Sequence, residues 1–212
     1  IHIRRAGGGV SMTGMEEFHK KIVHERVFPK REAVFTPFPD RILPELRAFL
    51  ESSGISMVYS HQGEMFDRAV DGENVIVTTS TASGKTLGFL LPVLQEILTN
   101  PAARAIFLYP TKALASDQFR SFVPLLEFFG PSRLQAGIYD GDTPSAERGR
   151  IRSSANIVLT NPEMLNATFL PNHGSYGFSF FFANLKYIVV DELHSYRGAF
   201  GSHLANVMKR LG

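Results

Sequence analysis

"VIVTTSTASGKT", residues 75–86, decides the fold class that the sequence predicts. Three β-branched residues at 75–77, typical of a strand, are followed by a series of small residues. The apolar helix pattern LGFLLPVLQEIL, residues 87–98, comes directly after the loop. A strand that turns through small residues into a helix directs several backbone N–H groups to one point at the positive end of the helix dipole. Such a point attracts phosphate, so this stretch predicts a phosphate-binding strand, loop and helix.

The loop in this unit matches most of the phosphate-binding pattern G-x-x-x-x-G-K-[ST]. The second glycine, the lysine and the hydroxyl of the pattern fall on Gly84, Lys85 and Thr86. The first glycine falls on Thr79, so the match is incomplete. The residues that would wrap around a polyphosphate are small: Ser80, Thr81, Ala82 and Ser83. Lys85 would neutralise the β- and γ-phosphates, and the Thr86 hydroxyl would coordinate Mg²⁺. The alternative interpretation is a serine- and threonine-rich turn with a solvated lysine.

Short β-rich runs recur along the chain, and stretches of helical pattern separate them. Runs that are apolar on both faces and are connected by helices predict parallel strands covered on both sides. The predicted strands are NVIVT (74–78), RAIFLY (104–109), LQAGIY (134–139), NIVLT (156–160) and KYIVV (186–190). The predicted fold class is therefore α/β, a three-layer α/β/α domain with a mostly parallel sheet.

The last predicted strand leads into an acidic pair, Asp191 and Glu192. In an open parallel sheet, ligands bind beyond the carboxyl ends of the strands, so we expect this pair to meet the phosphate loop at one edge. Asp191 would hold Mg²⁺ through water, and Glu192 would orient or deprotonate the attacking water. The alternative interpretation is a pair of ordinary solvated residues that cap a helix.

The composition excludes several kinds of site and protein. Cysteine is absent from the 212 residues, which rules out disulfides and thiolate metal sites. The sequence has no run of about 18 apolar residues and no signal-peptide core, so we expect a cytoplasmic protein without membrane contact. The net charge is only +2, so contacts with nucleic acid would have to come from local donors.

The N-terminal part of the chain has a different character from the rest. Residues 1–12, IHIRRAGGGVSM, are interpreted as a flexible leader or a tag remnant. Apolar residues recur at helical spacing from residue 15 to residue 27, and PELRAFLESSG (44–54) reads as a helix that a glycine closes. These patterns predict a helical N-terminal extension over residues 13–50, followed by the α/β domain over residues 51–212.

The motifs, taken in order, resemble those of the first RecA-like domain of superfamily 2 helicases of the DEAD/DEAH-box kind. The matching segments are YSHQ (59–62, with the adenine-reading glutamine), TASGKT (81–86, motif I), YPTKALASDQ (109–118, motif Ia), YDGDT (139–143, the glycine-containing motif), TNPEML (160–165, motif Ib) and DELH (191–194, motif II). The spellings TNPEMLNATFLPNH and DELHSYRGAFGSHLANVMKRL are still closer to the DNA-repair helicases that move 3′ to 5′ and carry a zinc-binding C-terminal domain. The resemblance covers about residues 40–212.

The resemblance implies a RecA-like P-loop NTPase fold with ATP and Mg²⁺ as ligands, in the N-terminal motor domain of an ATP-dependent DNA helicase. The residues it assigns to ATP are Gln62, Thr81, Ala82, Ser83, Gly84, Lys85 and Thr86, and those it assigns to catalysis are Lys85, Asp191, Glu192 and His194. Gln62 would recognise adenine, because an amide pairs with the N6 donor and the N7 acceptor. His194 would connect the ATP site to a second RecA-like domain of the same polypeptide. That domain supplies the arginine finger in this family, so the present piece should hydrolyse ATP very slowly by itself.

The resemblance also implies a nucleic-acid surface at strand ends and helix starts, made of Pro110, Thr111, Lys112, Gly141, Thr160 and Asn161. Hydroxyls and free N–H groups at such places hold phosphates without reading bases. DNA is expected rather than RNA, on the resemblance alone. The alternative interpretations are helix capping by Thr111 and Thr160, a surface position for Gln62 and a buried structural role for His194.

Two further clusters have structural interpretations. FSFFF (178–182) is expected to be core or interface packing rather than a base-stacking platform. Arg148, Arg150 and Arg152 are expected to form a solvated face, with contact to the DNA backbone as the alternative. Two other functions remain open. One is a double-strand translocase subunit that uses the same motifs without unwinding, and the other is a non-catalytic module that binds nucleic acid or a partner. The intact lysine and acidic pair count against the non-catalytic module.

Overall fold

The computed structural model describes residues 33–78, 84–175 and 177–211. Val34–Gly212 form one compact unit in which strands and helices alternate along the chain. Three predicted parts of the chain lie outside the described residues: the leader, the helix near residues 15–27 and the phosphate-loop residues Thr79, Ser80, Thr81, Ala82 and Ser83.

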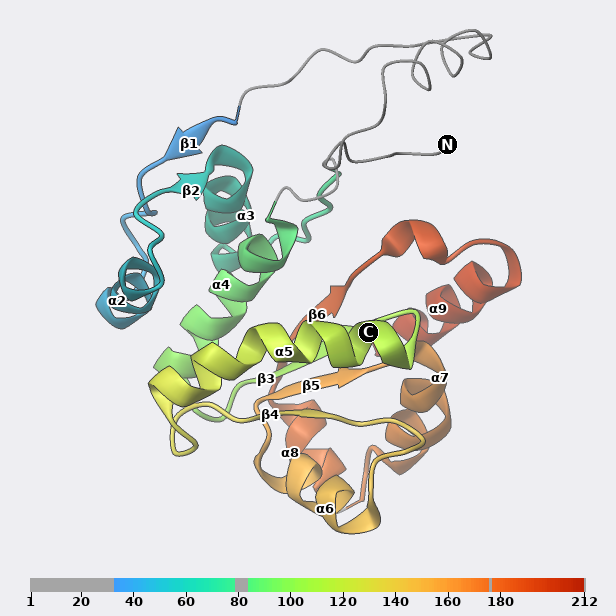
Figure 1. The fold of residues 1–212 in the computed structure, drawn as a ribbon. Helices are drawn as coiled ribbons and strands as arrows, with labels where there is room; N and C mark the ends of the chain where they lie inside the picture. The colour runs from blue at the N-terminus through green and yellow to red at the C-terminus, as the bar shows by residue number, and fades with distance from the viewer. Residues whose placement is uncertain (1–32, 79–83, 176, 212) are drawn as a thin grey trace, which may run out of the picture. The chain divides into compact units, whose positions relative to one another are not determined.

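A parallel sheet lies at the centre of this unit (Figure 1). Its strand order is β4-β5-β3-β6, and each neighbouring pair is parallel. The strands are β3 (Arg104–Leu108), β4 (Ala136–Ile138), β5 (Ile157–Thr160) and β6 (Leu185–Val190). The last four predicted runs therefore form the predicted sheet, and the α/β fold class is confirmed.

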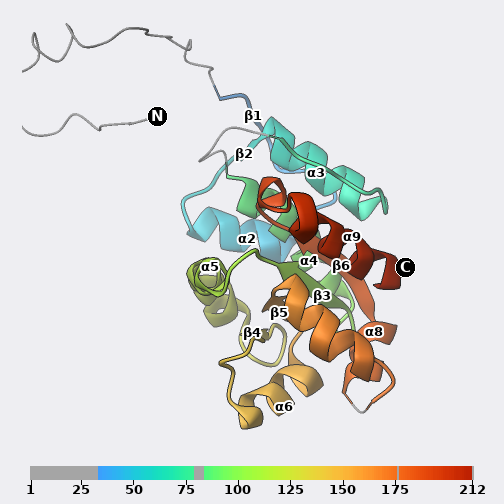
Figure 2. The ribbon, with the colours of Figure 1, turned by 90° about the vertical axis from the view of Figure 1, so that its right-hand side faces the viewer.

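Helices cover both faces of this sheet (Figures 1 and 2). They are α2 (Pro44–Ser52), α3 (Ser60–Val70), α4 (Lys85–Thr99), α5 (Lys112–Phe129), α6 (Ser145–Ser154), α7 (Pro162–Met164), α8 (Phe178–Ala183) and α9 (Gly198–Leu211). Shorter turns are the π-helical Leu165–Phe169 and the 3₁₀ turns Leu170–Asn172 and Leu193–Ser195. Since each strand runs in the same direction, the carboxyl ends of β3, β4, β5 and β6 lie at one edge of the sheet.

Successive residues of the strands point into two different cores, as the pleat requires. Phe107 and Leu159 are fully buried in the core that α2, α3, α4 and α5 cover. Ile106 and Leu108 are fully buried in the opposite core, which includes residues of α6, α8 and α9. The sheet is therefore the middle of three layers.

The FSFFF segment forms α8 and packs as predicted. Phe178 and Phe181 are buried in the second core. Phe180 is exposed, and the Arg104 guanidinium lies over its ring at 4.9 Å from the centroid. The interpretation of this segment as core packing is confirmed for the two buried rings.

The predicted strand NVIVT (74–78) is wrong for this structure. These residues have no regular secondary structure, and Ile76 is 78% exposed. Strand β6 pairs with β3 along one edge, and among the described residues no strand pairs with its other edge. High β-propensity reflects a good fit to a pleated, half-buried surface. A run that lacks a neighbouring strand does not meet that condition, so it stays outside the sheet.

The described N-terminal residues join the same core as the sheet. Helix α2 occupies the stretch predicted to be helical, and Gly54 follows it with φ of 79°. Leu46 and Leu50 of α2 are fully buried in the first core. Before α2 the chain forms β1 (Phe35–Thr36), which pairs antiparallel with β2 (Val58–Tyr59) instead of continuing a helix. The compact unit therefore begins well before the predicted boundary at residue 51. Within the described residues, no helix has the length and apolar character needed to cross a bilayer.

Candidate nucleotide site and nucleic-acid surface

Gln62, in the first turn of α3, holds the start of α4. Its Nε2 donates to the Gly84 carbonyl oxygen at 2.7 Å, and its Oε1 accepts from the Tyr59 backbone N–H at 2.9 Å. Gly84 has a left-handed φ of 69°, and a Cβ there would lie 2.6 Å from Gln62 Nε2. Glycine is therefore required at this turn. Gln62 is 3% exposed, so it is not the surface glutamine of the alternative interpretation.

Lys85 and Thr86 are the first two residues of α4. This position puts them at the positive end of the helix dipole, where negative charge is stabilised. The Thr86 hydroxyl lies 3.5 Å from Oε1 of Gln118, which belongs to α5. Gln118 is therefore an additional side chain at the site, and its only signal in the sequence is its place at the end of YPTKALASDQ.

Asp191 directly follows β6, at the carboxyl edge of the sheet. Its backbone N–H donates to the Leu108 carbonyl oxygen at 3.1 Å, and its Oδ1 accepts from the Glu192 N–H at 2.8 Å. Burial raises the pKa of the Asp191 carboxyl, and the charge of Glu192 adds to this effect. Lys85 and His194 act in the opposite direction.

Glu192 is the one non-glycine residue in the described part of the chain with positive φ, at 50°. A left-handed backbone at a residue with a Cβ costs about 1 to 3 kcal/mol and is often retained at functional sites. The Glu192 Oε2 lies 3.1 Å from Nδ1 of His194, and the His194 side chain is 69% exposed. His194 is therefore not the buried structural histidine of the alternative interpretation.

Two tyrosine hydroxyls that have no role in the sequence analysis are influenced by the charge of Asp191. The hydroxyl oxygens of Tyr109 and Tyr196 are buried and have no hydrogen-bond partner. Burial raises the pKa of each hydroxyl, and the negative charge of Asp191 raises it further. Tyr196 stacks on Phe200 at 4.8 Å between centroids, in the second core. Tyr109 follows β3, and its position directly after a buried strand at the ligand edge is the signal that could have identified it.

The raised pKa of Asp191 gives a prediction about stability. A carboxyl whose pKa is higher in the folded than in the unfolded chain stabilises the fold below its ordinary pKa, and this contribution is lost as the pH rises through the folded value. Asp191→Asn removes the buried charge but keeps the oxygen that accepts from Glu192. We expect the melting temperature at pH 7.5 to rise by about 2 to 4 °C. The gain should shrink as the pH falls toward 4.

Thermal melts of both chains across this pH range provide the measurement. The matched control is Asp40→Asn, because Asp40 is exposed and lies outside the site. An Asp191→Asn chain that melts below the wild type at pH 7.5 would show that the carboxylate stabilises the fold, contrary to this expectation.

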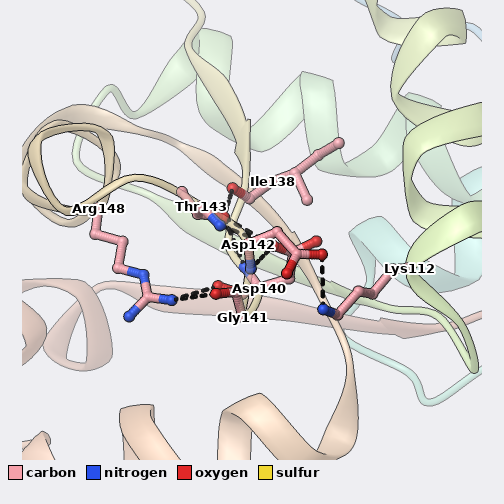
Figure 3. Close-up of polar contacts among 7 residues, drawn as sticks. All are labelled: Lys112, Ile138, Asp140, Gly141, Asp142, Thr143 and Arg148. Atoms are coloured by element: carbon pink, nitrogen blue, oxygen red, sulfur yellow. Dashed lines mark hydrogen bonds and ion pairs between the residues drawn. The ribbon is translucent and has the colours of Figure 1, made fainter.

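The loop after β4 is organised by Asp140 (Figure 3). Its Oδ1 accepts from the backbone N–H groups of Asp142 at 2.8 Å and Thr143 at 3.0 Å. Nη2 of Arg148, from α6, donates to the carbonyl oxygens of Asp140 at 2.8 Å and Gly141 at 3.1 Å. Arg148 is therefore part of the loop structure, and its assignment to a solvated face is wrong. These bonds fix the loop and leave Gly141 and Asp142 exposed.

Lys112, the first residue of α5, forms an ion pair with this loop (Figure 3). Its Nζ lies 2.8 Å from Oδ2 of Asp142, and the two side chains are 47% and 81% exposed. The hydrogen bond that Lys112 donates to Asp142 raises the pKa of Lys112. Exposed ion pairs of this kind contribute little to stability.

The other arginines of α6 differ from each other. Arg150 pairs with Glu147 at 2.6 Å and is exposed, as predicted. Arg152 donates to the Tyr139 hydroxyl at 3.2 Å and lies over the Phe178 ring at 5.4 Å from the centroid. The solvated-face interpretation is therefore wrong for Arg152, because its guanidinium packs on aromatic rings.

The residues predicted to contact nucleic acid lie at or just after the carboxyl ends of β3, β4 and β5: Pro110, Thr111, Lys112, Gly141, Thr160 and Asn161. The Thr111 hydroxyl accepts from the Leu114 backbone N–H at 3.2 Å. Oδ1 of the Asn161 side chain accepts from the Met164 backbone N–H at 2.8 Å, so both residues cap helices. The Thr160 hydroxyl instead donates to the Tyr139 carbonyl oxygen at 2.7 Å, and Thr160 is 2% exposed. Of the six predicted residues, the exposed ones are Thr111, Lys112 and Gly141.

Comparisons with known proteins agree with the geometry. A family model described as DEAD/DEAH box helicase matches residues 59–212. The chain is 44% identical to the ATP-dependent helicase YprA of Bacillus subtilis, over 91% of this chain and 25% of that protein. It is 40% identical to the ATP-dependent helicase HRQ1 of Saccharomyces cerevisiae, over 92% of this chain and 18% of that protein. The chain therefore spans a quarter or less of the length of these relatives.

Solved structures show the same fold. The DUF1998 helicase MrfA bound to DNA and AMPPNP matches with a TM-score of 0.85 and 42% identity, over 95% of this chain and 28% of that chain. The helicase Lhr of Mycobacterium smegmatis bound to ssDNA and AMP-PNP matches with a TM-score of 0.68 and 25% identity, over 81% of this chain and 23% of that chain. The predicted RecA-like helicase fold is confirmed.

Proposed function

Because this chain belongs to the DEAD/DEAH box helicase family, we propose that it is the N-terminal ATP-binding motor domain of an ATP-dependent DNA helicase. Such a protein couples ATP hydrolysis to movement along nucleic acid and to strand separation. The observation that carries the proposal is the position of Lys85 and Thr86 at the start of α4, behind a left-handed Gly84 whose carbonyl oxygen accepts from Gln62. The relatives named as ATP-dependent helicases and the DNA-bound MrfA structure support it.

ATP would bind with its phosphates at the start of α4. Lys85 would neutralise the terminal phosphates, and the helix dipole would add to this attraction. Gln62 uses one N–H for Gly84 and one lone pair for Tyr59, so one donor and one acceptor remain on its amide. These are the two groups that the N7 and N6 positions of adenine require.

The side chains near the phosphates suit Mg²⁺. The Thr86 hydroxyl and the Asp191 carboxylate are oxygen ligands, and Mg²⁺ is usually held by one or two such groups, several waters and the phosphates of the substrate. Among the described residues, no group of three or more His, Asp or Glu side chains could hold a metal by itself. A cation that needs the nucleotide as a ligand therefore fits this site. When bound, Mg²⁺ would neutralise charge on the phosphates.

Glu192 would accept the proton of the attacking water, since it is the carboxylate next to Asp191 with a fixed backbone. His194 contacts Glu192 and is exposed, so it is placed to carry a contact from this site to a second RecA-like domain. That domain, from the same polypeptide, would supply the arginine that stabilises the transition state. Alone, the present chain would hydrolyse ATP very slowly.

Nucleic acid would cross the carboxyl edge of the sheet beyond β3, β4 and β5. Lys112 offers a positive charge there once a phosphate replaces Asp142, and the exposed Thr111 and Gly141 lie beside it. None of these groups reads a base, so the contact would be to the backbone of the strand. DNA is proposed as the strand because MrfA is described as bound to DNA.

The test uses a polypeptide that joins this chain to a second RecA-like domain. We expect single-stranded DNA to stimulate its ATPase activity and ATP to drive displacement of one strand from a forked DNA duplex. Displacement of a triplex strand without duplex unwinding would instead identify a double-strand translocase. Binding of DNA without any ATP hydrolysis would identify a non-catalytic module and would overturn the proposal.

A further inference from the structure

Tyr109 and Asp191 lie beside each other at the carboxyl edge of the sheet. In the parallel pair of β3 and β6, Leu108 is level with Val190, so the next residues of the two strands are Tyr109 and Asp191. The Asp191 N–H donates to the Leu108 carbonyl oxygen at 3.1 Å, which continues the ladder to this level. Side chains at one level of neighbouring strands point to the same face. Tyr109 packs in the core that includes α4, the helix that begins with Lys85.

The Tyr109 hydroxyl has no partner in this structure. The residue is fully buried, and its hydroxyl oxygen makes no hydrogen bond. A buried hydroxyl without a partner destabilises the fold, and a phenylalanine of the same shape would avoid that cost. Packing alone therefore does not explain the hydroxyl. Asp191 follows the neighbouring strand at the same level, so its carboxylate is the ionisable group that the strand register places beside Tyr109.

Tyr187 provides a comparison on the next strand. It lies on β6, packs against the same core and also has a partly buried ring. Its hydroxyl donates to the Ala69 carbonyl oxygen at 3.3 Å, so it has a structural partner. Tyr109 and Tyr187 thus differ in whether the hydroxyl is satisfied within the fold.

We infer that Tyr109 is a positioning residue for Asp191, whose hydroxyl donates a hydrogen bond to the Asp191 carboxylate when the nucleotide and its magnesium are bound. This inference rests on the proposed function. The bond would hold the carboxylate in the orientation needed for the metal, because Asp191 has one further oxygen beyond the one that accepts from Glu192.

The test is Tyr109→Phe in the 212-residue chain, with Tyr187→Phe as the matched control. Binding of AMPPNP is measured by calorimetry with magnesium and again with EDTA. We expect Tyr109→Phe to weaken the magnesium-dependent affinity by about fivefold to tenfold and to leave the EDTA affinity unchanged. Without nucleotide, its melting temperature should equal or exceed that of the wild type, since an unsatisfied hydroxyl is removed.

Tyr187→Phe should show the opposite pattern, with a lower melting temperature and an unchanged magnesium-dependent affinity. Equal magnesium-dependent affinities of the Tyr109→Phe and wild-type chains would overturn the inference, as would a Tyr109→Phe chain that melts lower and loses affinity equally with and without magnesium. A wild-type chain that binds no AMPPNP even with magnesium would instead contradict the proposed nucleotide site. The failures of the two proposals are therefore distinguishable.

Discussion

Glu192→Gln is expected to reduce DNA-stimulated ATP hydrolysis by about 10² to 10⁴-fold while ATP binding is retained. Glutamine has the same size as glutamate but cannot accept a proton from water. The backbone at residue 192 is fixed by the Asp191 carboxylate, which accepts its N–H at 2.8 Å, so the amide should occupy the place of the carboxylate. The measurement is steady-state ATPase activity in the two-domain polypeptide with saturating single-stranded DNA.

The matched control for this variant is Glu127→Gln, which removes an exposed carboxylate from α5. This control should keep wild-type turnover. Nucleotide affinity measured with AMPPNP should be the same in both variants, because only the proton acceptor is altered. Turnover of the Glu192→Gln protein close to that of the control would contradict the role assigned to Glu192.

Lys85→Ala is expected to weaken the binding of magnesium and AMPPNP to the chain by about thirtyfold or more, because a charge-assisted contact to phosphate is lost. The variant has a second expected effect on the acidic pair. Lys85 lowers the pKa of Asp191, so its removal should raise that pKa further. Calorimetry gives the affinity, and NMR titration of the Asp191 carboxyl carbon gives the pKa.

Lys209→Ala is the matched control, since Lys209 is an exposed lysine in the last turn of α9. It makes the same change in net charge far along the chain from the site. Equal nucleotide affinity of the Lys85→Ala and Lys209→Ala chains would remove the phosphate role of Lys85. An unchanged Asp191 pKa in Lys85→Ala would contradict the electrostatic link between the two residues.

Strands β3, β5 and β6 could be predicted because their sequences are short runs of apolar and β-branched residues, the composition that buried parallel strands require. Residues 104–108 and 157–160 are apolar or buried on both faces, as a central parallel strand must be. The run at 74–78 has equal β-propensity, but a strand also needs a neighbouring edge, and local composition holds no information about that edge. This is why one run of similar composition stays outside the sheet.

Some features of the site could likewise be predicted from the local sequence, and others could not. The glycine turn at Gly84 and the acidic pair could be predicted, because backbone conformation and strand ends impose local requirements. Two features could not be predicted: the missing partner of the Tyr109 hydroxyl and the hydrogen bond from the Thr160 hydroxyl to the Tyr139 carbonyl oxygen. Both depend on contacts between strands that are far apart in the sequence. The bond from Gln62 to the Gly84 carbonyl likewise joins residues 22 positions apart.

The ion pair between Lys112 and Asp142 has a consequence for how binding depends on ionic strength. Asp142 serves as a built-in counterion for this lysine. If a nucleic-acid phosphate replaces Asp142 as the partner of Lys112, that phosphate releases a condensed cation to the solution. The freed Asp142 carboxylate then attracts a cation from the solution. The two exchanges oppose each other. Affinity at this edge should therefore fall less steeply with added salt than a simple tally of cationic side chains would indicate.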